Sequence, residues 1–334
     1  MEALLAQRPT RAEVDLGKLE QNFRVLRAHV TQSVKVLAVV KADAYGHGAL
    51  RVSRTLAAVG VDAFGVAIVE EGVALRAGGV EQPILLLSGL FPGQEELVVQ
   101  HRLTPTIYQL ETLKNLSAAA RQRGVVVPYH LKVDTGMGRV GVEPEQAVSL
   151  LKQASSLKGV RLEGVLTHLS SADEVDDAYT RLQLSRFETA LADIEDSGFS
   201  IEIKHAANSA GTLYHSDSWF DMVRPGLALY GVSPSEEKLD FPLEPILSLR
   251  TSITFLKRVP PERPLGYTRT FVTREESVIA TIPVGYGDGL RRQLSNKGRV
   301  IIRGHYAPMV GNISMDSTLV DVSGVPDVGL GDEV

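Results

Sequence analysis

The chain has 334 residues, of which 44% are hydrophobic and 22% charged, the ordinary balance of a globular protein that can bury a full core. A formal charge of −5 argues against broad electrostatic binding to nucleic acid or to an anionic membrane. No apolar run approaches the roughly 18 residues of a membrane helix, the N-terminus lacks the pattern of a secretory signal, and the absence of cysteine excludes thiol nucleophiles, disulfides and thiolate metal sites. These features predict a cytoplasmic enzyme.

The first 240 residues alternate between short apolar or β-branched runs and longer stretches with apolar residues every three or four positions. The runs predict strands and the longer stretches predict helices, several of which end in glycine. The predicted strands are 35–42, 63–67, 83–89, 104–108, 128–134, 161–169, 201–207 and 222–231. This α/β alternation predicts a TIM-like (β/α)8 barrel over residues 1–240, with an open doubly wound sheet as the structural alternative.

The pattern changes after about residue 240, and the segment KLDFPLEP (238–245) is the predicted boundary. Beyond it, short strand-like runs are separated by Gly, Pro and Asn turns, with almost no helical periodicity. These runs lie within 241–259, 276–289, 298–304, 307–313 and 317–322. Residues 241–334 are therefore predicted to form an all-β domain.

Polar residues follow several of the predicted barrel strands, where barrel enzymes carry their catalytic groups. They are Lys41, Lys132 with Arg139, His168, Ser209 and Arg224. A single lysine after an apolar run is usually a solvated strand end. However, the last two loops offer Ser209, glycines and backbone N–H groups of the kind that bind phosphate. A phosphate site opposite a lysine, with no cysteine and no cluster of metal-ligand spacing, indicates pyridoxal phosphate (PLP), whose aldehyde forms a Schiff base with a lysine amine.

Seven motifs carry a resemblance to a known family. They are VVKADAYGHG (39–48), LKVDTGMGRVG (131–141), THLSSAD (167–173), HAANSAG (205–211), VRPGLALYG (223–231), IPVGYGDG (282–289) and VGNISMD (310–316). In this order the sequence resembles the alanine racemase family, fold-type III PLP enzymes with a barrel and a C-terminal β domain. The resemblance implies a PLP-dependent isomerase that interconverts L- and D-alanine and supplies D-alanine for peptidoglycan. It also implies a homodimer with shared active sites.

The resemblance implies two acid/base residues. Lys41 would hold PLP as the Schiff-base lysine, and Tyr267, in GYTRTF (266–271), would reach in from the partner subunit. Two opposed groups are needed because one removes the α-proton from one face while the other supplies a proton to the opposite face. A tyrosine with a pKa near 10 would need a cationic neighbourhood to act as a base at neutral pH. The family commonly has glycine where this chain has Thr268.

Arg224 resembles the family arginine that faces the pyridine nitrogen of PLP. A guanidinium only donates hydrogen bonds, so it fits an unprotonated nitrogen, weakens the electron sink and disfavours transamination. Arg139 would contact the phenolic oxygen of PLP and the substrate carboxylate, and Lys132 resembles a lysine that is often carbamylated and positions this arginine. The other implied contacts are His168 beside the ring, Tyr45, Ser209, Gly226 and Leu227 at the phosphate, and Met315 and Tyr286 at the substrate.

The sequence also departs from the family pattern. Asn312 and Ser314 occupy positions where many members have Arg and Cys. Members usually continue for a few dozen residues past Val334, in a stretch with another phosphate-contacting tyrosine and closing strands of the β domain.

Other functions stay open beside alanine racemisation. A broader-specificity or serine racemase is one, because a methylene is worth only about 1–3 kcal/mol in an apolar pocket. A PLP-dependent amino-acid decarboxylase is another, disfavoured because such relatives place an acid where Arg224 stands. A PLP-carrier protein would lack the β domain.

Overall fold

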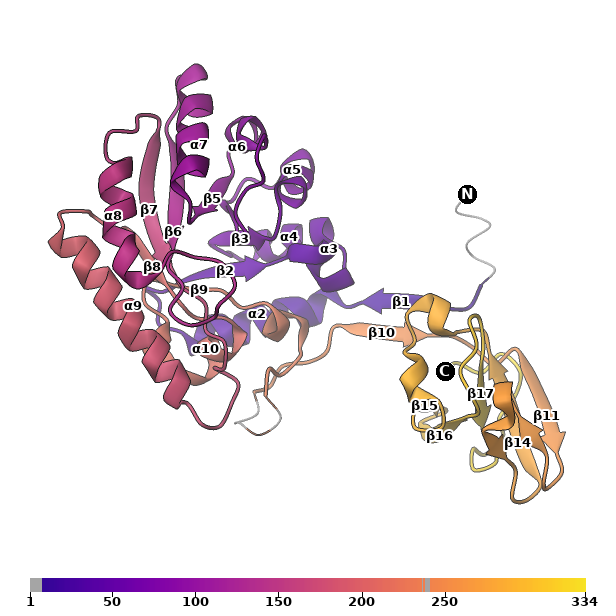
Figure 1. Cartoon of the computed structure of the whole chain (residues 1–334). Coiled ribbons are helices and arrows are strands. Elements are labelled where there is room, and N and C mark those ends of the chain that lie inside the picture. The colour runs from indigo at the N-terminus through magenta and orange to yellow at the C-terminus, as the bar shows by residue number, and fades with distance from the viewer. Residues whose placement is uncertain (1–7, 236, 238–240) are drawn as a thin grey trace. The chain divides into compact units, whose positions relative to one another are not determined.

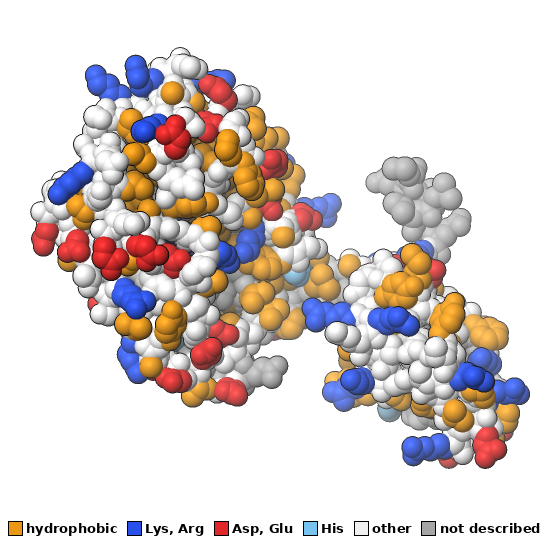
Figure 2. Space-filling model, in the orientation of Figure 1, with side chains coloured by type: hydrophobic (Ala, Val, Ile, Leu, Met, Phe, Trp, Pro, Cys, Tyr) orange, Lys and Arg blue, Asp and Glu red, His pale blue; other side chains and the backbone are white. Residues whose placement is uncertain are grey.

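The computed structural model describes residues 8–235, 237 and 241–334. They divide into two compact units (Figure 1). We call residues 15–246 the barrel unit and residues 8–14 with 247–334 the β unit. Acidic and basic side chains both occur across the face of the barrel unit that Figure 2 shows. Within the described residues, no helix has the length and apolar character needed to cross a membrane.

The barrel unit contains an eight-stranded sheet in the order β8-β7-β6-β5-β4-β3-β2-β9, whose strand pairs are all parallel. The strands are β2 (Lys35–Val39), β3 (Ala63–Val66), β4 (Ile84–Leu86), β5 (Thr104–Ile107), β6 (Val127–Lys132), β7 (Val160–Leu166), β8 (Ile203–His205) and β9 (Met222–Val223). The Asp221 amide donates to the Lys204 carbonyl (2.9 Å) and the Arg224 amide to the Ala207 carbonyl (3.0 Å), which brings the last strand against β8. The predicted barrel is thereby confirmed over the open sheet.

Helices lie outside this sheet (Figure 1); the first precedes β2 in the chain and the others connect successive strands. They are α2 (Leu16–His29), α3 (Lys41–Gly46), α4 (Ala49–Ala58), α5 (Val69–Ala77), α6 (Glu95–Gln100), α7 (Leu110–Gln122), α8 (Pro144–Ala154), α9 (Ala178–Asp196) and α10 (Ser209–Tyr214). In α9 the buried side chains include Leu184, Phe187 and Leu191, which recur every three or four residues and pack in one core cluster with residues of β6 and β7. Asn208 caps α10 by accepting the Gly211 amide at 2.9 Å, so that this helix begins just after β8.

The β unit is built from antiparallel strands, as the sequence predicts. Its main sheet has the order β11-β14-β17-β16-β15, with β11 (Phe255–Val259), β14 (Ser277–Ile282), β15 (Arg299–Ile302), β16 (His305–Val310) and β17 (Thr318–Asp321). Two further pairs are β1 (Arg11–Val14) with β10 (Leu247–Arg250), and β12 (Pro264–Leu265) with β13 (Phe271–Val272). Buried Ala280, Ile282 and Val320 belong to its core.

The division of the chain differs from the expected bounds 1–240 and 241–334. Strand β1, expected in the barrel, pairs with β10, and Glu13 forms an ion pair with Arg250 at 2.9 Å. Residues 241–246 belong instead to the barrel unit. Asn22 holds this segment there, because its side chain donates to the Glu244 carbonyl (2.8 Å) and accepts the Glu244 amide (2.9 Å). The first three residues of the boundary segment KLDFPLEP lie outside the described residues.

Candidate active site

A cavity of about 380 Å³ opens at the C-terminal ends of the barrel strands. It brings together all the site residues predicted for the barrel: Lys41, Tyr45, Lys132, Arg139, His168, Ser209, Arg224, Gly226 and Leu227. Sequence reasoning missed Ser88, Asp173 and Asn208, which also line it. Asp173 and Asn208 lie within the motifs 167–173 and 205–211, and their position after a strand could have identified them as site residues. Ser88 follows β4 but belongs to none of the motifs.

Lys41 stands at the start of a strained turn. The next four residues, 42–45, have φ between 51° and 56°, the left-handed conformation that residues with a Cβ rarely adopt. The Lys41 Nζ lies 5.9 Å from the centroid of the Tyr45 ring, so both side chains face the cavity together. Burial and the positive charge of Arg139 lower the pKa of Lys41, while Glu71 opposes this. The Lys41 amine therefore loses its proton at a lower pH than the amine of an exposed lysine does.

Arg224 follows β9 and is 3% exposed. Its Nη2 donates to the carbonyls of Thr167 (2.8 Å) and Ala206 (2.9 Å), and its Nη1 donates to Nδ1 of His205 (2.9 Å). Nη2 also lies 3.3 Å from Nδ1 of His168. Burial lowers the pKa of Arg224 to about 9, which leaves the guanidinium charged at neutral pH. A fixed, charged donor thus lines the cavity.

Two buried histidines extend this contact away from the cavity. Because His205 accepts from Arg224 at Nδ1, neutral His205 carries its hydrogen on Nε2 and donates it to Nδ1 of His130 over 2.8 Å. His130 in turn donates from Nε2 to Oε2 of Glu163 over 3.1 Å. Burial, together with the charge of Arg224, lowers the pKa of both histidines, so the chain of hydrogen bonds runs in one direction through neutral rings.

Lys132 and Arg139 add positive charge to the cavity. Lys132 is 3% exposed, and burial together with the charges of Arg224 and Arg139 lowers its pKa to about 8. The loop that carries Arg139 is organised by the Asp134 carboxylate, which accepts the amides of Gly136 (3.0 Å), Gly138 (3.0 Å) and Arg139 (3.2 Å). Cationic side chains from several strand ends therefore surround a space suited to an anionic ligand.

Tyr45, Ser209 and Gly226, which line the same cavity, form a small cradle. Ser209 accepts the amides of Gly226 (2.8 Å) and Ala228 (3.3 Å) at its hydroxyl oxygen, which ties the loop after β9 to α10. A Cβ on Gly226 would lie 2.6 Å from the Tyr45 hydroxyl oxygen, so a side chain there would fill the cradle. Because the Ser209 oxygen accepts these amides, its hydroxyl hydrogen and that of Tyr45 can donate to a phosphate group. With the Lys41 amine in the same cavity, the donor set fits both the phosphate and the aldehyde of PLP.

The other three predicted site residues belong to the β unit. Tyr267, Tyr286 and Met315 are exposed, with Tyr267 at 69%. Their loops are joined by hydrogen bonds: the Tyr286 amide donates to the Ser314 carbonyl (3.0 Å), and the Asn312 side chain donates to the Tyr267 carbonyl (3.0 Å). The predicted residues therefore lie on one connected group of loops in this unit.

Thr268, one of the departures from the family pattern, has a φ of 58°, the conformation that favours glycine. Its hydroxyl donates to the Tyr267 carbonyl (2.6 Å) and accepts from the Asn312 side chain (2.8 Å). Asn312 is the second departure, so two unusual residues of this chain are bonded to each other beside Tyr267.

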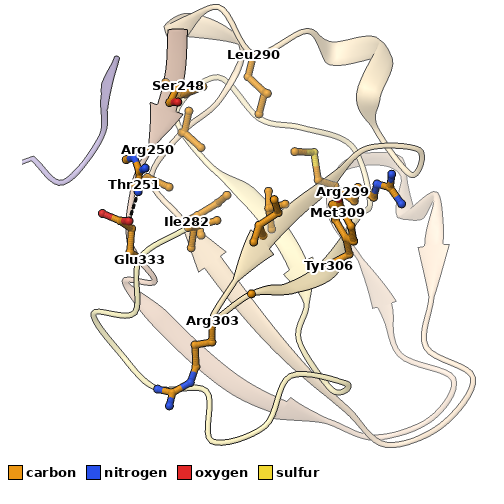
Figure 3. A pocket seen from close by; sticks show the side chains of 16 residues that line it. Ser248, Arg250, Thr251, Ile282, Leu290, Arg299, Arg303, Tyr306, Met309 and Glu333 are labelled. Carbon is orange, nitrogen blue, oxygen red and sulfur yellow. Dashed lines mark hydrogen bonds and ion pairs between the residues drawn. The ribbon is translucent and has the colours of Figure 1, made fainter. Parts of the chain in front are cut away.

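A second, larger cavity of about 840 Å³ lies within the β unit (Figure 3). Its lining is mainly apolar, with Ile282, Leu290 and Met309 among its side chains. Its charged groups have partners: Arg250 forms an ion pair with Glu333, and Arg299 lies 4.0 Å above the Tyr306 ring. None of the predicted site residues lines it.

The barrel, the lysine at its rim, the cationic side chains and the hydroxyl-lined cradle are the features of a barrel enzyme of the PLP-dependent class. The family model for the N-terminal domain of alanine racemase matches residues 14–234, and that for the C-terminal domain matches residues 246–334. The chain belongs to the alanine racemase family, and the PLP-dependent isomerase class predicted from the sequence is confirmed.

Individual relatives agree with this assignment. The chain is 45% identical to the alanine racemase of Halothermothrix orenii, covering 98% of this chain and 86% of the relative, and 43% identical to that of Desulfovibrio desulfuricans, covering 98% and 88%. The alanine racemase structure from Streptomyces coelicolor matches with a TM-score of 0.90 and 36% identity, covering 98% of this chain and 87% of that one. The structure from Bartonella henselae, with covalently bound pyridoxal phosphate, matches with a TM-score of 0.88 and 33% identity, covering 97% and 89%.

Proposed function

We propose that the protein racemises alanine at the barrel rim, with PLP held on Lys41, and so supplies D-alanine for peptidoglycan in the cytoplasm. The observation that carries this proposal is the single cavity in which Lys41, the buried Arg224 and the Ser209–Gly226 cradle meet. Lysine, arginine and a phosphate site occur there in the combination that PLP chemistry requires.

Each part of the cofactor has a proposed partner in this cavity. The Lys41 amine would hold the aldehyde carbon, and Arg224 would face the ring nitrogen, with His168 beside the ring. Arg139 would face the phenolic oxygen. The phosphate would be held by Tyr45, Ser209, Gly226 and Leu227. When bound, PLP supplies electron withdrawal that acidifies the α-C–H bond of an attached amino acid.

Lys41 and Tyr267 of the partner subunit then act as the two bases. Lys41 takes or returns the α-proton on one face, and its lowered pKa favours the neutral amine that this role needs. Tyr267 of the partner subunit does the same on the opposite face. The exposure of Tyr267 in its own β unit supports a position at an interface between two copies of the chain.

Arg224 would keep the reaction on the racemisation path. The charged guanidinium would donate to the ring nitrogen and cannot accept a hydrogen bond from it, so the nitrogen would stay unprotonated and the ring would withdraw electrons only weakly. The α-carbon would then regain a proton before transamination could occur. A decarboxylase is disfavoured for the same reason: Arg224, which is held by two carbonyls and His205, would occupy the position at the ring nitrogen where that chemistry needs an acid.

Lys132 is proposed to be carbamylated. Its neutral amine would attack CO₂, forming an N–C bond and releasing a proton, and the product would be an anion among cations. That anion would pair with Arg139 and orient it toward the phenolic oxygen of PLP and the substrate carboxylate. Without the modification Lys132 and Arg139 would repel each other.

The β-unit loops would complete the substrate site across a homodimer. The backbone of Met315 of the partner subunit would donate to the substrate carboxylate, and Tyr286 of the partner subunit would stand at the entrance. The hydrogen bonds that join the loops of these residues and Tyr267 support their acting as one group.

The test is a visible spectrum of the purified protein before and after borohydride, followed by polarimetry with L-alanine and L-serine. We expect a PLP absorbance that borohydride removes and loss of optical rotation with L-alanine. Equal or faster loss with L-serine would favour the broader-specificity or serine racemase, and release of CO₂ without racemisation would favour the decarboxylase.

A further inference from the structure

The backbone after Lys41 needs outside support. Residues 42–45 form a left-handed turn of four consecutive non-glycine residues, a conformation that usually occurs in single residues. Strained segments of this kind persist only where their surroundings hold them. Because Lys41 precedes the turn and Tyr45 ends it, whatever holds the turn also sets where these two side chains lie in the cavity.

A carboxylate from the neighbouring helix α5 provides such support. Glu71, in the first turn of α5, accepts the Ala42 amide at Oε1 over 2.6 Å and the Ala67 amide at Oε2 over 2.7 Å. The Ala42 amide belongs to the peptide bond that directly follows Lys41. Since Ala42 follows β2 and Ala67 follows β3, one partly buried carboxylate joins two adjacent loops of the barrel rim.

We propose that Glu71 is a positioning residue for Lys41, which fixes the left-handed turn and places a negative charge close to the lysine amine. Glu71 does not line the cavity, so it would act through Lys41 without touching PLP or substrate. The inference rests on the proposed role of Lys41 as the lysine that holds PLP.

The negative charge of Glu71 stabilises the protonated form of Lys41, whose other charged neighbours are mainly cationic. Burial and Arg139 lower the pKa of Lys41, and Glu71 raises it. The other titratable or charged groups that line the same cavity are Tyr45, Lys132, His168, Asp173 and Arg224. Burial keeps His168 and Tyr45 neutral, because it lowers the pKa of the first and raises that of the second. Removing the charge of Glu71 should therefore lower the pKa of Lys41 further.

The test uses the full chain, stripped of PLP and recombined with it. Glu71→Gln preserves the size of the side chain but removes the charge and one acceptor oxygen. We expect the pH midpoint for formation of the borohydride-reducible linkage to move to lower pH. At a pH above the midpoints of both proteins, where Lys41 is neutral in each, we expect PLP to bind roughly tenfold more weakly to the variant, the effect of losing one charge-assisted hydrogen bond.

Glu70→Gln is the matched control. Glu70 lies in the same first turn of α5, but its carboxylate accepts from the Gln94 side chain (2.9 Å), away from the turn. This variant should match the wild type in both measurements. Should Glu71→Gln yield no folded protein by circular dichroism, Glu71→Asp replaces it. This residue retains the charge but is too short to span both amides, so it should weaken PLP binding with little change in the pH midpoint.

Two results would count against different proposals. If Glu71→Gln only lowers the urea midpoint and leaves PLP affinity and the pH midpoint at wild-type values, Glu71 is a helix cap and the inference is wrong. Peptide mapping of the borohydride-reduced wild type tests the proposed function separately. PLP fixed on a lysine other than Lys41 would overturn that function, whatever the variants do.

Discussion

The Arg224 guanidinium donates to Nδ1 of His205 over 2.9 Å, and both side chains are buried. Because a guanidinium can only donate, this contact determines which nitrogen of His205 carries hydrogen. His205 therefore donates from Nε2 to His130, and His130 in turn donates to the Glu163 carboxylate. Arg224, proposed to face the ring nitrogen of PLP, is thus held in place by His205, His130 and Glu163, none of which lines the cavity.

Replacing His205 tests that support. His205→Phe removes the acceptor and leaves a buried, charged donor of Arg224 unpaired, so we expect the free energy of unfolding to fall by about 1–3 kcal/mol. The absorbance of bound PLP should change as well. Urea denaturation and a visible spectrum measure the two effects. His205→Asn keeps an acceptor oxygen on a shorter side chain, so its free energy of unfolding should fall by less. An equal fall in the two variants would argue against a specific contact with Arg224.

Arg224→Glu should change the reaction that the site performs. A carboxylate allows the ring nitrogen to be protonated, which strengthens the electron sink and exposes the substrate to transamination. We expect slower racemisation and faster conversion of bound PLP to its amine form, followed by polarimetry and by absorbance. Wild-type rates of both processes would show that Arg224 does not face that nitrogen.

Modification of Lys132 should depend on pH through its lowered pKa. Only the neutral amine adds CO₂, and its fraction in the folded protein rises as the pH passes about 8, where an ordinary lysine would need a pH near 10.5. At a fixed partial pressure of isotopically labelled CO₂, labelling detected by NMR should therefore increase across this range. Lys132→Met should remove the signal. A label that persists in this variant would place the carbamate elsewhere.

Thr268 should carry a measurable conformational cost. Thr268→Ala loses both hydroxyl hydrogen bonds but keeps the positive φ, whereas Thr268→Gly loses the bonds and relieves the strain. We expect the glycine variant to be more stable than the alanine variant by about 1 kcal/mol in urea denaturation. Equal stabilities would mean that the loop relaxes out of the left-handed conformation when the hydroxyl is removed.

The shared active site predicts a pattern of complementation. Homodimers of Lys41→Ala and of Tyr267→Phe should both fail to racemise alanine at an appreciable rate. Mixed dimers from co-expression should regain activity at one of their two sites, because one site receives both wild-type groups. Polarimetry on heterodimers isolated with two different tags measures this. No recovery in confirmed heterodimers would place both bases in one subunit.

Much of the barrel site was predictable because strand ends in a barrel meet at one rim. Lys41, His168 and Arg224 each follow an apolar run, and the parallel alternation of strands and helices brings such positions together. The partners of Arg224 were less accessible to sequence reasoning. His130 and Glu163 resemble ordinary polar residues within strands, and only the pairing of β6, β7 and β8 brings them into line.

The sequence alone determined the order of elements and the two kinds of architecture, because apolar periodicity follows directly from which side chains must be buried. It also determined which residue types follow each strand. That β1 belongs to the β unit is visible only in the folded chain, because strand pairing across more than 200 positions depends on partners that no local pattern specifies. The tertiary structure likewise decided the left-handed turn at residues 42–45, because a strained backbone is set by distant contacts such as the Glu71 carboxylate and not by the preferences of its own residues.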